Sequence, residues 1–181
     1  MSGLVAEACV LVVVDLQEKL VPAIRDHGDV LERAEILLRA AGICGVPTVV
    51  TEHFPDKIGG TVPALMQAGV DPVVVSKSHF DACDEPGFVE AMAAMGRRQA
   101  VVCGTEAHVC VLQTALGLKG LGYDAHVVTD ASGSRRESDR ETGYRRLAMA
   151  GVIPVTSEMV VFEWAKRGGT DQFRELLALI K

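Results

Sequence analysis

The sequence predicts an α/β fold: a three-layer, doubly wound architecture in which a parallel sheet of about six strands carries helices on both faces. Two observations predict it. Short β-branched runs recur along the whole chain, and segments with helical spacing of apolar residues separate them. Most of the runs are apolar at consecutive positions, which is typical of strands covered on both faces. Alternation of strand and helix then implies parallel pairing through right-handed crossovers.

Six segments have the composition of buried strands, and each is bounded by Gly, Pro or an acidic residue. They are 8–15, 46–51, 72–77, 99–104, 123–130 and 151–156. The first of them, "ACVLVVVD", ends in an acid after only seven other residues. It is too short for a membrane span and lacks the flanks of a signal peptide.

Five segments have the apolar spacing of amphipathic helices. They are 29–44, 85–96, 106–120, 136–151 and 157–168. In the first, Leu31, Ala34, Leu38 and Ala41 form one stripe. The segment 52–71 interrupts the alternation, because it holds two prolines and a Gly-Gly pair with little strand pattern. We expect a long loop there with a role in function or in partner contact.

Length and composition predict the general class of protein. A chain of 181 residues that is 49% hydrophobic can bury one sizeable core, so we expect one domain over 1–181. A net charge of −6 with scattered basic residues argues against nucleic acid or a membrane surface as partner. We expect a small-molecule substrate. Five cysteines without a C-x-x-C pair predict reduced thiols and a cytoplasmic protein.

Three chemically useful side chains lie at or shortly after the carboxyl ends of different predicted strands, the edge where ligands bind in such sheets. They are Asp15, Lys77 and Cys110. Each has an ordinary interpretation: an acid that ends a strand, a solvated lysine and a small buried hydrophobe. Together they suggest that Asp15 accepts the thiol proton, Lys77 stabilises negative charge and Cys110 attacks. A helix start and a nearby ammonium favour the thiolate, so we expect Cys110 to be the most reactive of the cysteines.

Further polar and aromatic residues lie near these strand ends and are expected to line a substrate pocket. They are Gln17, His53, Phe54, His79, Phe80 and His108. The three histidines lack the ligand spacing of metal sites, so we expect neither a metal nor another cofactor.

Several motifs resemble the isochorismatase-like cysteine hydrolase superfamily, which has a Rossmann-like fold. They are "VVVDLQEKL", "TEHFPDKIGGTVPAL", "SKSHFDA", "CGTEAHVCVLQTALGL" and "VVTDASGSR" followed by "VTSE". Their order and spacing extend over essentially the whole chain. The similarity is closest to the small isochorismatase domain-containing proteins.

The resemblance implies roles for individual residues. The catalytic triad of the family corresponds to Asp15, Lys77 and Cys110, and its non-proline cis peptide to Thr105–Glu106. The backbone N–H groups of Glu106 and Cys110 would form an oxyanion hole. The implied activity is hydrolysis of a small amide, ureide or related C–N bond through a thioester. The resemblance also implies a homo-oligomer, a dimer or larger.

Three alternatives are weighed against this activity. Isochorismatases of the family do without the cysteine, so the presence of Cys110 favours amide-like substrates. Nicotinamidases of the family bind a metal through an acid and histidines after the second strand. Here that segment reads "TEHFP", an incomplete match, so nicotinamidase activity is disfavoured. The rival from another class is a non-catalytic or redox-sensing member that uses the scaffold for protein association.

Overall fold

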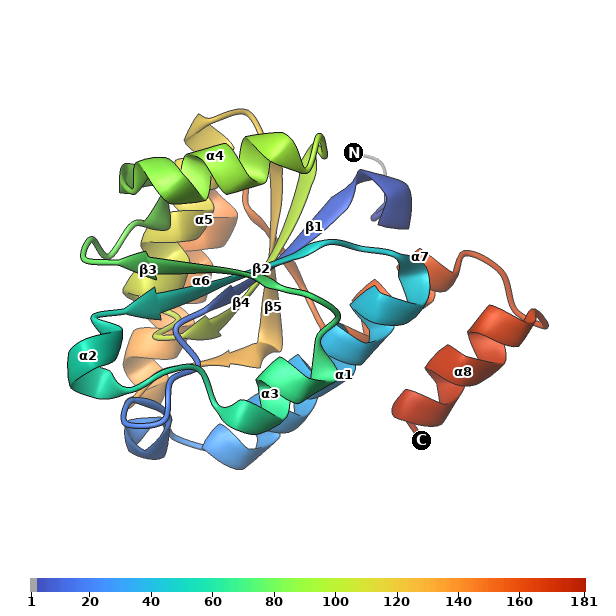
Figure 1. Ribbon diagram of the computed structural model, residues 1–181, viewed down its shortest axis with the longest axis horizontal. Coiled ribbons are helices and arrows are strands. Elements are labelled where there is room, and N and C mark those ends of the chain that lie inside the picture. Colours follow the sequence, from blue (N-terminus) through green and yellow to red (C-terminus); the bar gives the residue numbers. More distant parts are fainter. Residues whose placement is uncertain (1–2) are drawn as a thin grey trace.

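Residues 3–181 are described by a computed structural model of the chain. A six-stranded parallel sheet forms its centre (Figure 1), with the strand order β3-β2-β1-β4-β5-β6. The strands are β1 (Cys9–Val14), β2 (Thr48–His53), β3 (Val73–Lys77), β4 (Gln99–Thr105), β5 (Asp124–Gly133) and β6 (Ile153–Val155). The predicted α/β class and all six predicted strands are confirmed.

Strand β1 lies in the middle of the sheet because its sequence, CVLVVV, has no side chain that needs water. All six of its residues are buried, and it pairs with β2 on one side and β4 on the other. The chain builds outward from β1 to β3 and then returns to start β4 on the opposite side of β1. The crevice outside the carboxyl ends of strands at such a switch point is where ligands bind in parallel α/β sheets.

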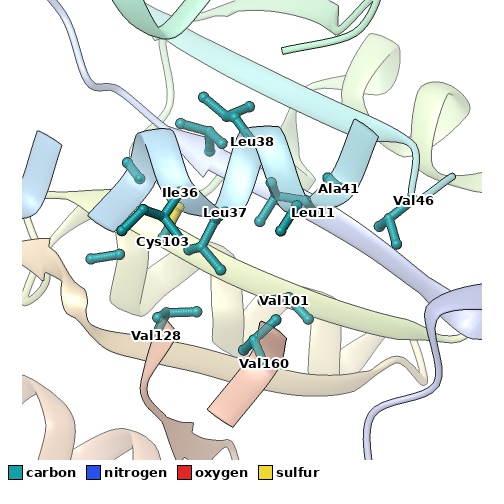
Figure 2. Close-up of a cluster of buried hydrophobic side chains, with 14 of the residues drawn as sticks. Leu11, Ile36, Leu37, Leu38, Ala41, Val46, Val101, Cys103, Val128 and Val160 are labelled. Carbon is teal, nitrogen blue, oxygen red and sulfur yellow. The ribbon is translucent and has the colours of Figure 1, made fainter. Parts of the chain in front are cut away.

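Helices cover both faces of the sheet and bury one apolar cluster on each. The first cluster takes side chains from α1 (His27–Cys44), α3 (Pro63–Ala68), α7 (Ser157–Ala165) and α8 (Asp171–Leu179). The second takes them from α4 (Pro86–Ala94), α5 (Cys110–Gly120) and α6 (Glu137–Met149). Figure 2 shows the first cluster, where Leu37 of α1 lies near Leu11 and Val101. Each fully buried Leu or Val contributes roughly 1.5–3 kcal/mol.

The segment 52–71 differs from the predicted long loop. It contains two short helices, α2 (Pro55–Ile58) and α3, and Thr61 forms an isolated antiparallel bridge with Gln17. Prolines begin both helices, where the missing N–H costs nothing. The remaining short elements are 3₁₀ turns, η1 (Ala6–Ala8), η2 (Val21–Ala23) and η3 (Ala82–Asp84). Cys83 lies in η3.

Two further helices depart from the sequence prediction. Helix α5 begins at Cys110 and not at the start of 106–120, because Val109 has a non-helical backbone (φ −121°, ψ −92°). Helix α8 was not predicted at all. Its N-cap Thr170 accepts a hydrogen bond from the Phe173 N–H, and Leu176 is buried against the first cluster. Among residues 3–181, no helix has both the length and the apolar character needed to cross a membrane.

Candidate active site

Asp15 follows the last residue of β1 and is held by hydrogen bonds from both neighbouring strands. Its Oδ1 accepts from Thr51 Oγ1 at 2.7 Å, and its backbone oxygen accepts from Thr105 Oγ1, also at 2.7 Å. The residue has no exposed surface. Its backbone lies at φ 49°, a left-handed conformation in which aspartate is enriched among non-glycine residues. These bonds fix the carboxylate at the switch point between β1 and β4.

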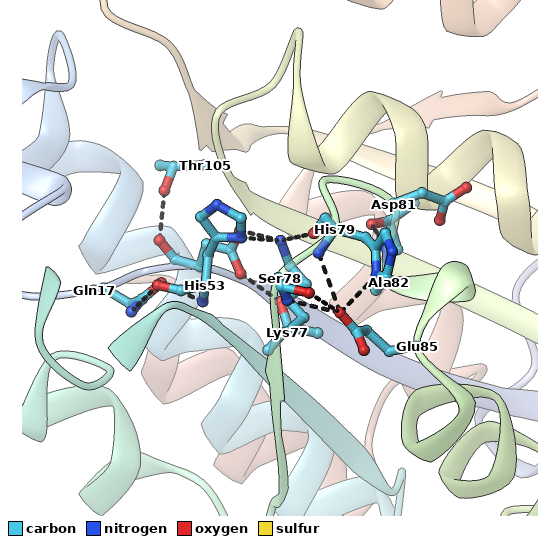
Figure 3. A network of polar contacts seen from close by, with 12 residues as sticks. Gln17, His53, Lys77, Ser78, His79, Asp81, Ala82, Glu85 and Thr105 are labelled. Atoms are coloured by element: carbon cyan, nitrogen blue, oxygen red, sulfur yellow. Dashed lines mark hydrogen bonds and ion pairs between the residues drawn. The ribbon is translucent and has the colours of Figure 1, made fainter. Parts of the chain in front are cut away.

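Lys77 ends β3 and brings a buried ammonium to this carboxylate. Its Nζ lies 2.8 Å from Asp15 Oδ2, and neither side chain is exposed. The same nitrogen donates to the backbone oxygen of His79 at 3.0 Å and lies 3.5 Å from His53 Nδ1 (Figure 3). Burial of two charges is tolerated when they are paired and hydrogen-bonded. The ion pair joins the ends of β1 and β3, which are not neighbours, because β2 lies between them.

Cys110 is the first residue of α5 and is buried. Burial above all, and the negative charge of Asp15 next, raise the pKa of its thiol to about 12, although Lys77 acts in the opposite direction. Burial and Asp15 thus act against the thiolate that the helix start and Lys77 favour. Both expected charge partners nevertheless act on this sulfur.

The backbone between β4 and α5 contains one feature that the resemblance implied, a cis peptide bond at Thr105–Glu106. Among residues 3–181, neither the Glu106 N–H nor the Cys110 N–H donates a hydrogen bond, whereas the Glu106 carbonyl accepts from Val109 and Val111. The Glu106 side chain turns to Arg135, whose Nε lies 3.0 Å from it. Two uncommitted donors thus flank the start of α5.

Aromatic rings stand beside the lysine. The imidazole of His53 stacks on Phe80 with ring centroids 5.3 Å apart, and it meets Phe54 edge-on at 4.6 Å. Both phenylalanines are partly open to solvent, at 41% for Phe54 and 52% for Phe80. Burial and then the charge of Lys77 lower the pKa of His53 below its usual 6.5. The ring is therefore neutral at neutral pH.

The other three predicted pocket residues make contacts of a different kind. Gln17 is buried, and its amide donates to the carbonyls of His53 and Gly59 while accepting from the His53 N–H, so its donors are all engaged. The imidazole of His79 pairs with Glu85 at 2.8 Å, and only its backbone oxygen touches Lys77. His108 contacts Ser134 Oγ at 2.9 Å and makes no hydrogen bond to Asp15, Lys77 or Cys110. The structure therefore groups His53, Phe54 and Phe80 with the lysine but not these three side chains.

Sequence reasoning missed two kinds of residue at this site. Thr51 and Thr105 hold Asp15, and both sit at strand ends that the sequence does predict. Glu85 holds the turn after Lys77, and the one available signal was an acid directly before a helix-starting proline. Within the described residues, no group of three or more His, Cys, Asp or Glu side chains is arranged to hold a metal ion.

Comparison with known proteins gives consistent matches. The family model described as Isochorismatase domain matches residues 9–159. Isochorismatase domain-containing protein 1 of Danio rerio is 38% identical over 168 residues, which are 92% of this chain, and the match spans 59% of the zebrafish protein, about three fifths of its length.

Two solved structures are similar over nearly the whole chain. One is described as the MAR1 ribonuclease of Caenorhabditis elegans, with a TM-score of 0.93, 32% identity, and coverage of 99% of this chain and 92% of that one. The other is the YcaC gene product of Escherichia coli, described as an octameric hydrolase of unknown specificity. Its TM-score is 0.93 and its identity 28%, with coverage of 99% of this chain and 90% of that one.

Proposed function

The chain belongs to the isochorismatase family, and from that premise we propose that it is a cysteine-dependent hydrolase of a small amide, ureide or related C–N bond. Asp15, Lys77 and Cys110 are the proposed catalytic residues. The observation that carries the proposal is the buried 2.8 Å ion pair between Lys77 Nζ and Asp15 Oδ2. Both charges act on the Cys110 thiol. Replacing such a buried pair by apolar residues of similar volume is often neutral or stabilising, so a role in chemistry explains the two charges better than packing does.

In the first half of the proposed reaction, Cys110 transfers its thiol proton to Asp15 while Sγ bonds to the substrate carbonyl carbon. The π electrons of the carbonyl move onto its oxygen, and the N–H groups of Glu106 and Cys110 stabilise the resulting oxyanion. Collapse of the oxyanion breaks the C–N bond, and the amine leaves with the proton from Asp15. The products of this half are a thioester on Cys110 and the free amine.

In the second half, water attacks the thioester carbonyl while Asp15 accepts its proton. Collapse breaks the C–S bond and releases the carboxylic acid, and the sulfur recovers its proton from Asp15. Lys77, 2.8 Å from Asp15, stabilises the negative charge on its neighbours. Because the pKa of the Cys110 thiol is raised to about 12, a resting thiolate is rare and attack is coupled to proton transfer.

The redox-sensing alternative fits the site less well. Sensor cysteines are solvent-accessible and have lowered pKa values. Cys110 is buried and its pKa is raised. A non-catalytic scaffold would also have no use for a buried lysine and aspartate at the same thiol. These observations favour the hydrolase.

We further propose that residues 1–181 act as one domain, that the substrate is a small molecule, and that the protein forms a homo-oligomer. The octameric E. coli relative supports assembly. So do the partly exposed Val73 and Val74 on the edge strand β3 and the nearby Phe80. One relative is described as a ribonuclease, but the net charge of −6 opposes binding of a polyanion.

A panel of amides, ureides and carbamates tests the proposal through release of ammonia or amine. We expect at least one member to be turned over by the wild type and not by Cys110→Ser. Cys44→Ser is the matched control, because Cys44 lies at the end of α1 away from the site. Mass spectrometry of quenched reactions should detect an acyl group on Cys110. Undiminished turnover by Cys110→Ser would contradict the proposed mechanism.

A further inference from the structure

Glu85 links the start of α4 to the turn that follows β3 (Figure 3). Its Oε1 accepts hydrogen bonds from the backbone N–H of Ser78 at 2.7 Å and of His79 at 3.1 Å. The same oxygen contacts the Ser78 hydroxyl at 3.2 Å and His79 Nδ1 at 2.8 Å. One carboxylate oxygen therefore makes four contacts with two consecutive residues and closes the turn.

The turn held by Glu85 carries the carbonyl that binds the lysine ammonium. The backbone oxygen of His79 accepts from Lys77 Nζ at 3.0 Å, and Asp15 Oδ2 lies 2.8 Å from the same nitrogen. An ammonium has three donors and no preferred plane, so its acceptors decide where it points. The position of the His79 carbonyl therefore determines where the Lys77 ammonium lies.

Glu85 is anchored by helix α4, which packs against the sheet. Phe88 and Met92, one and two turns further along α4, are buried in the second apolar cluster. The backbone oxygen of Glu85 accepts from the N–H groups of Phe88 and Val89, which fixes the residue to the first turn of the helix. Packing in the core is thereby connected through Glu85 to the end of β3.

We propose that Glu85 is a positioning residue, which clamps the 78–79 turn so that the His79 carbonyl holds Lys77 against Asp15. The inference rests on the proposed function, in which Lys77 stabilises negative charge. Glu85 makes no hydrogen bond to Asp15 or Cys110 and acts only through the turn. Hydrogen bonds from Ser78 and then His79 lower the pKa of Glu85 to about 2, so the acceptor stays charged at neutral pH.

The test compares Glu85→Ala with Glu85→Gln, which keeps an acceptor oxygen for the two backbone amides. Glu90→Gln is the matched control, because Glu90 is exposed on the same helix. With an amide that the wild type hydrolyses, Glu85→Ala should lower kcat about tenfold and leave KM within about twofold, since it disturbs the reaction and not substrate binding. Glu85→Gln should stay within about threefold of the wild type.

A second readout does not depend on turnover. Lys77 lowers the pKa of Cys110, and Asp15, the other charge acting on this sulfur, raises it. A loosened Lys77 should therefore slow alkylation of Cys110 by iodoacetamide, about threefold at pH 8.5, and Lys77→Met should give the full effect. Peptide mass spectrometry measures each cysteine separately, so alkylation of Cys44 serves as the internal reference.

The outcomes separate the clamp from the activity. The inference is overturned if Glu85→Ala keeps both the wild-type kcat and the wild-type rate of Cys110 alkylation. It is also overturned if Glu85→Ala and Glu85→Gln lose kcat to the same extent, because the effect would then come from the charge of Glu85. If the wild type hydrolyses no amide, the proposed function fails, while alkylation still decides the clamp. If Glu85→Ala does not fold, Glu85→Asp, with its shorter reach, should slow alkylation, and a wild-type rate there overturns the inference.

Discussion

His53 and Lys77 lie side by side, with 3.5 Å between the imidazole Nδ1 and the lysine Nζ. A second positive charge at this position would oppose the ammonium that pairs with Asp15. Burial lowers the pKa of His53 because it disfavours the charged ring, and the charge of Lys77 lowers it further. The contact links the protonation of one ring to the stability of the whole site.

The first prediction concerns stability in mild acid. A histidine with a lowered folded-state pKa stabilises the fold above its unfolded pKa of about 6.5, and the contribution is lost as pH falls through the lower folded value. We therefore expect the free energy of unfolding to fall below about pH 6.5, and to fall less in His53→Gln. Urea titrations between neutral pH and pH 5 measure it. His27→Gln, at the exposed start of α1, should behave as the wild type, and identical pH profiles for His53→Gln and the wild type would contradict the prediction.

The second prediction separates thiol reactivity from catalysis. Asp15 raises the pKa of Cys110, so Asp15→Asn should increase Cys110 alkylation by about tenfold at pH 8. The same variant should lose at least about 100-fold in turnover, because it removes the proton acceptor. Peptide-resolved iodoacetamide kinetics and an amine-release assay measure the two effects. The exposed Asp171→Asn on α8 is the control, and parallel changes in both quantities would show that Asp15 is not the acceptor.

A third prediction follows from the order of reactivity among the cysteines. Burial raises the pKa of both thiols, and burial together with Asp15 raises that of Cys110 to about 12, while Cys44 is only half-buried. We expect iodoacetamide to modify Cys44 before Cys110 in the resting protein. This reverses the order that the sequence predicts. Faster labelling of Cys110 at neutral pH would mean that its thiolate is stabilised more strongly than burial and Asp15 allow.

The fourth prediction is that hydrolysis survives metal chelation. Glu52 Oε1 is occupied by the backbone N–H and the hydroxyl of Thr61, at 2.7 and 2.8 Å, while the neighbouring His53 faces Lys77. The two side chains therefore do not converge as metal ligands must. Dialysis of the protein against EDTA should leave the rate of hydrolysis unchanged. Elemental analysis of the dialysed protein checks that metal has been removed. A loss that zinc, manganese or iron restores would favour nicotinamidase-type chemistry.

The fifth prediction tests the packing beneath the site. Gly104 of β4 has φ 129°, and an added Cβ would overlap the backbone of Val14. Gly104→Ala should lower the free energy of unfolding by at least about 3 kcal/mol. Alanine is strained at this φ, and its Cβ has no room beside Val14. Gly28→Ala in α1 has open space around it and should be neutral or stabilise by up to about 1 kcal/mol. Urea denaturation compares them, and equal stabilities would contradict the account of β4.

The sequence predicts the sheet and the meeting of Asp15 with Lys77 because both depend on strong local patterns. Consecutive apolar residues identify the strands, and parallel strands deliver the residues after their carboxyl ends to one edge. The protonation of Cys110 could not be predicted in this way, since it depends on how deeply the helix start is buried. Glu85 was not predicted either, because its contacts form only when α4 packs onto the sheet.

The position of β3 at the margin of the sheet has a consequence for partial unfolding. In a subunit released from the proposed homo-oligomer, β3 pairs with β2 alone among the described strands, and Val73 and Val74 are partly exposed. Edge elements with few buried contacts open at a lower free energy than the core. Such an opening would withdraw Lys77 and leave Asp15 without its counter-charge while β1, β4 and β5 stay intact. Loss of function on heating should therefore precede loss of the core, and hydrogen exchange in β3 should be faster than in β1.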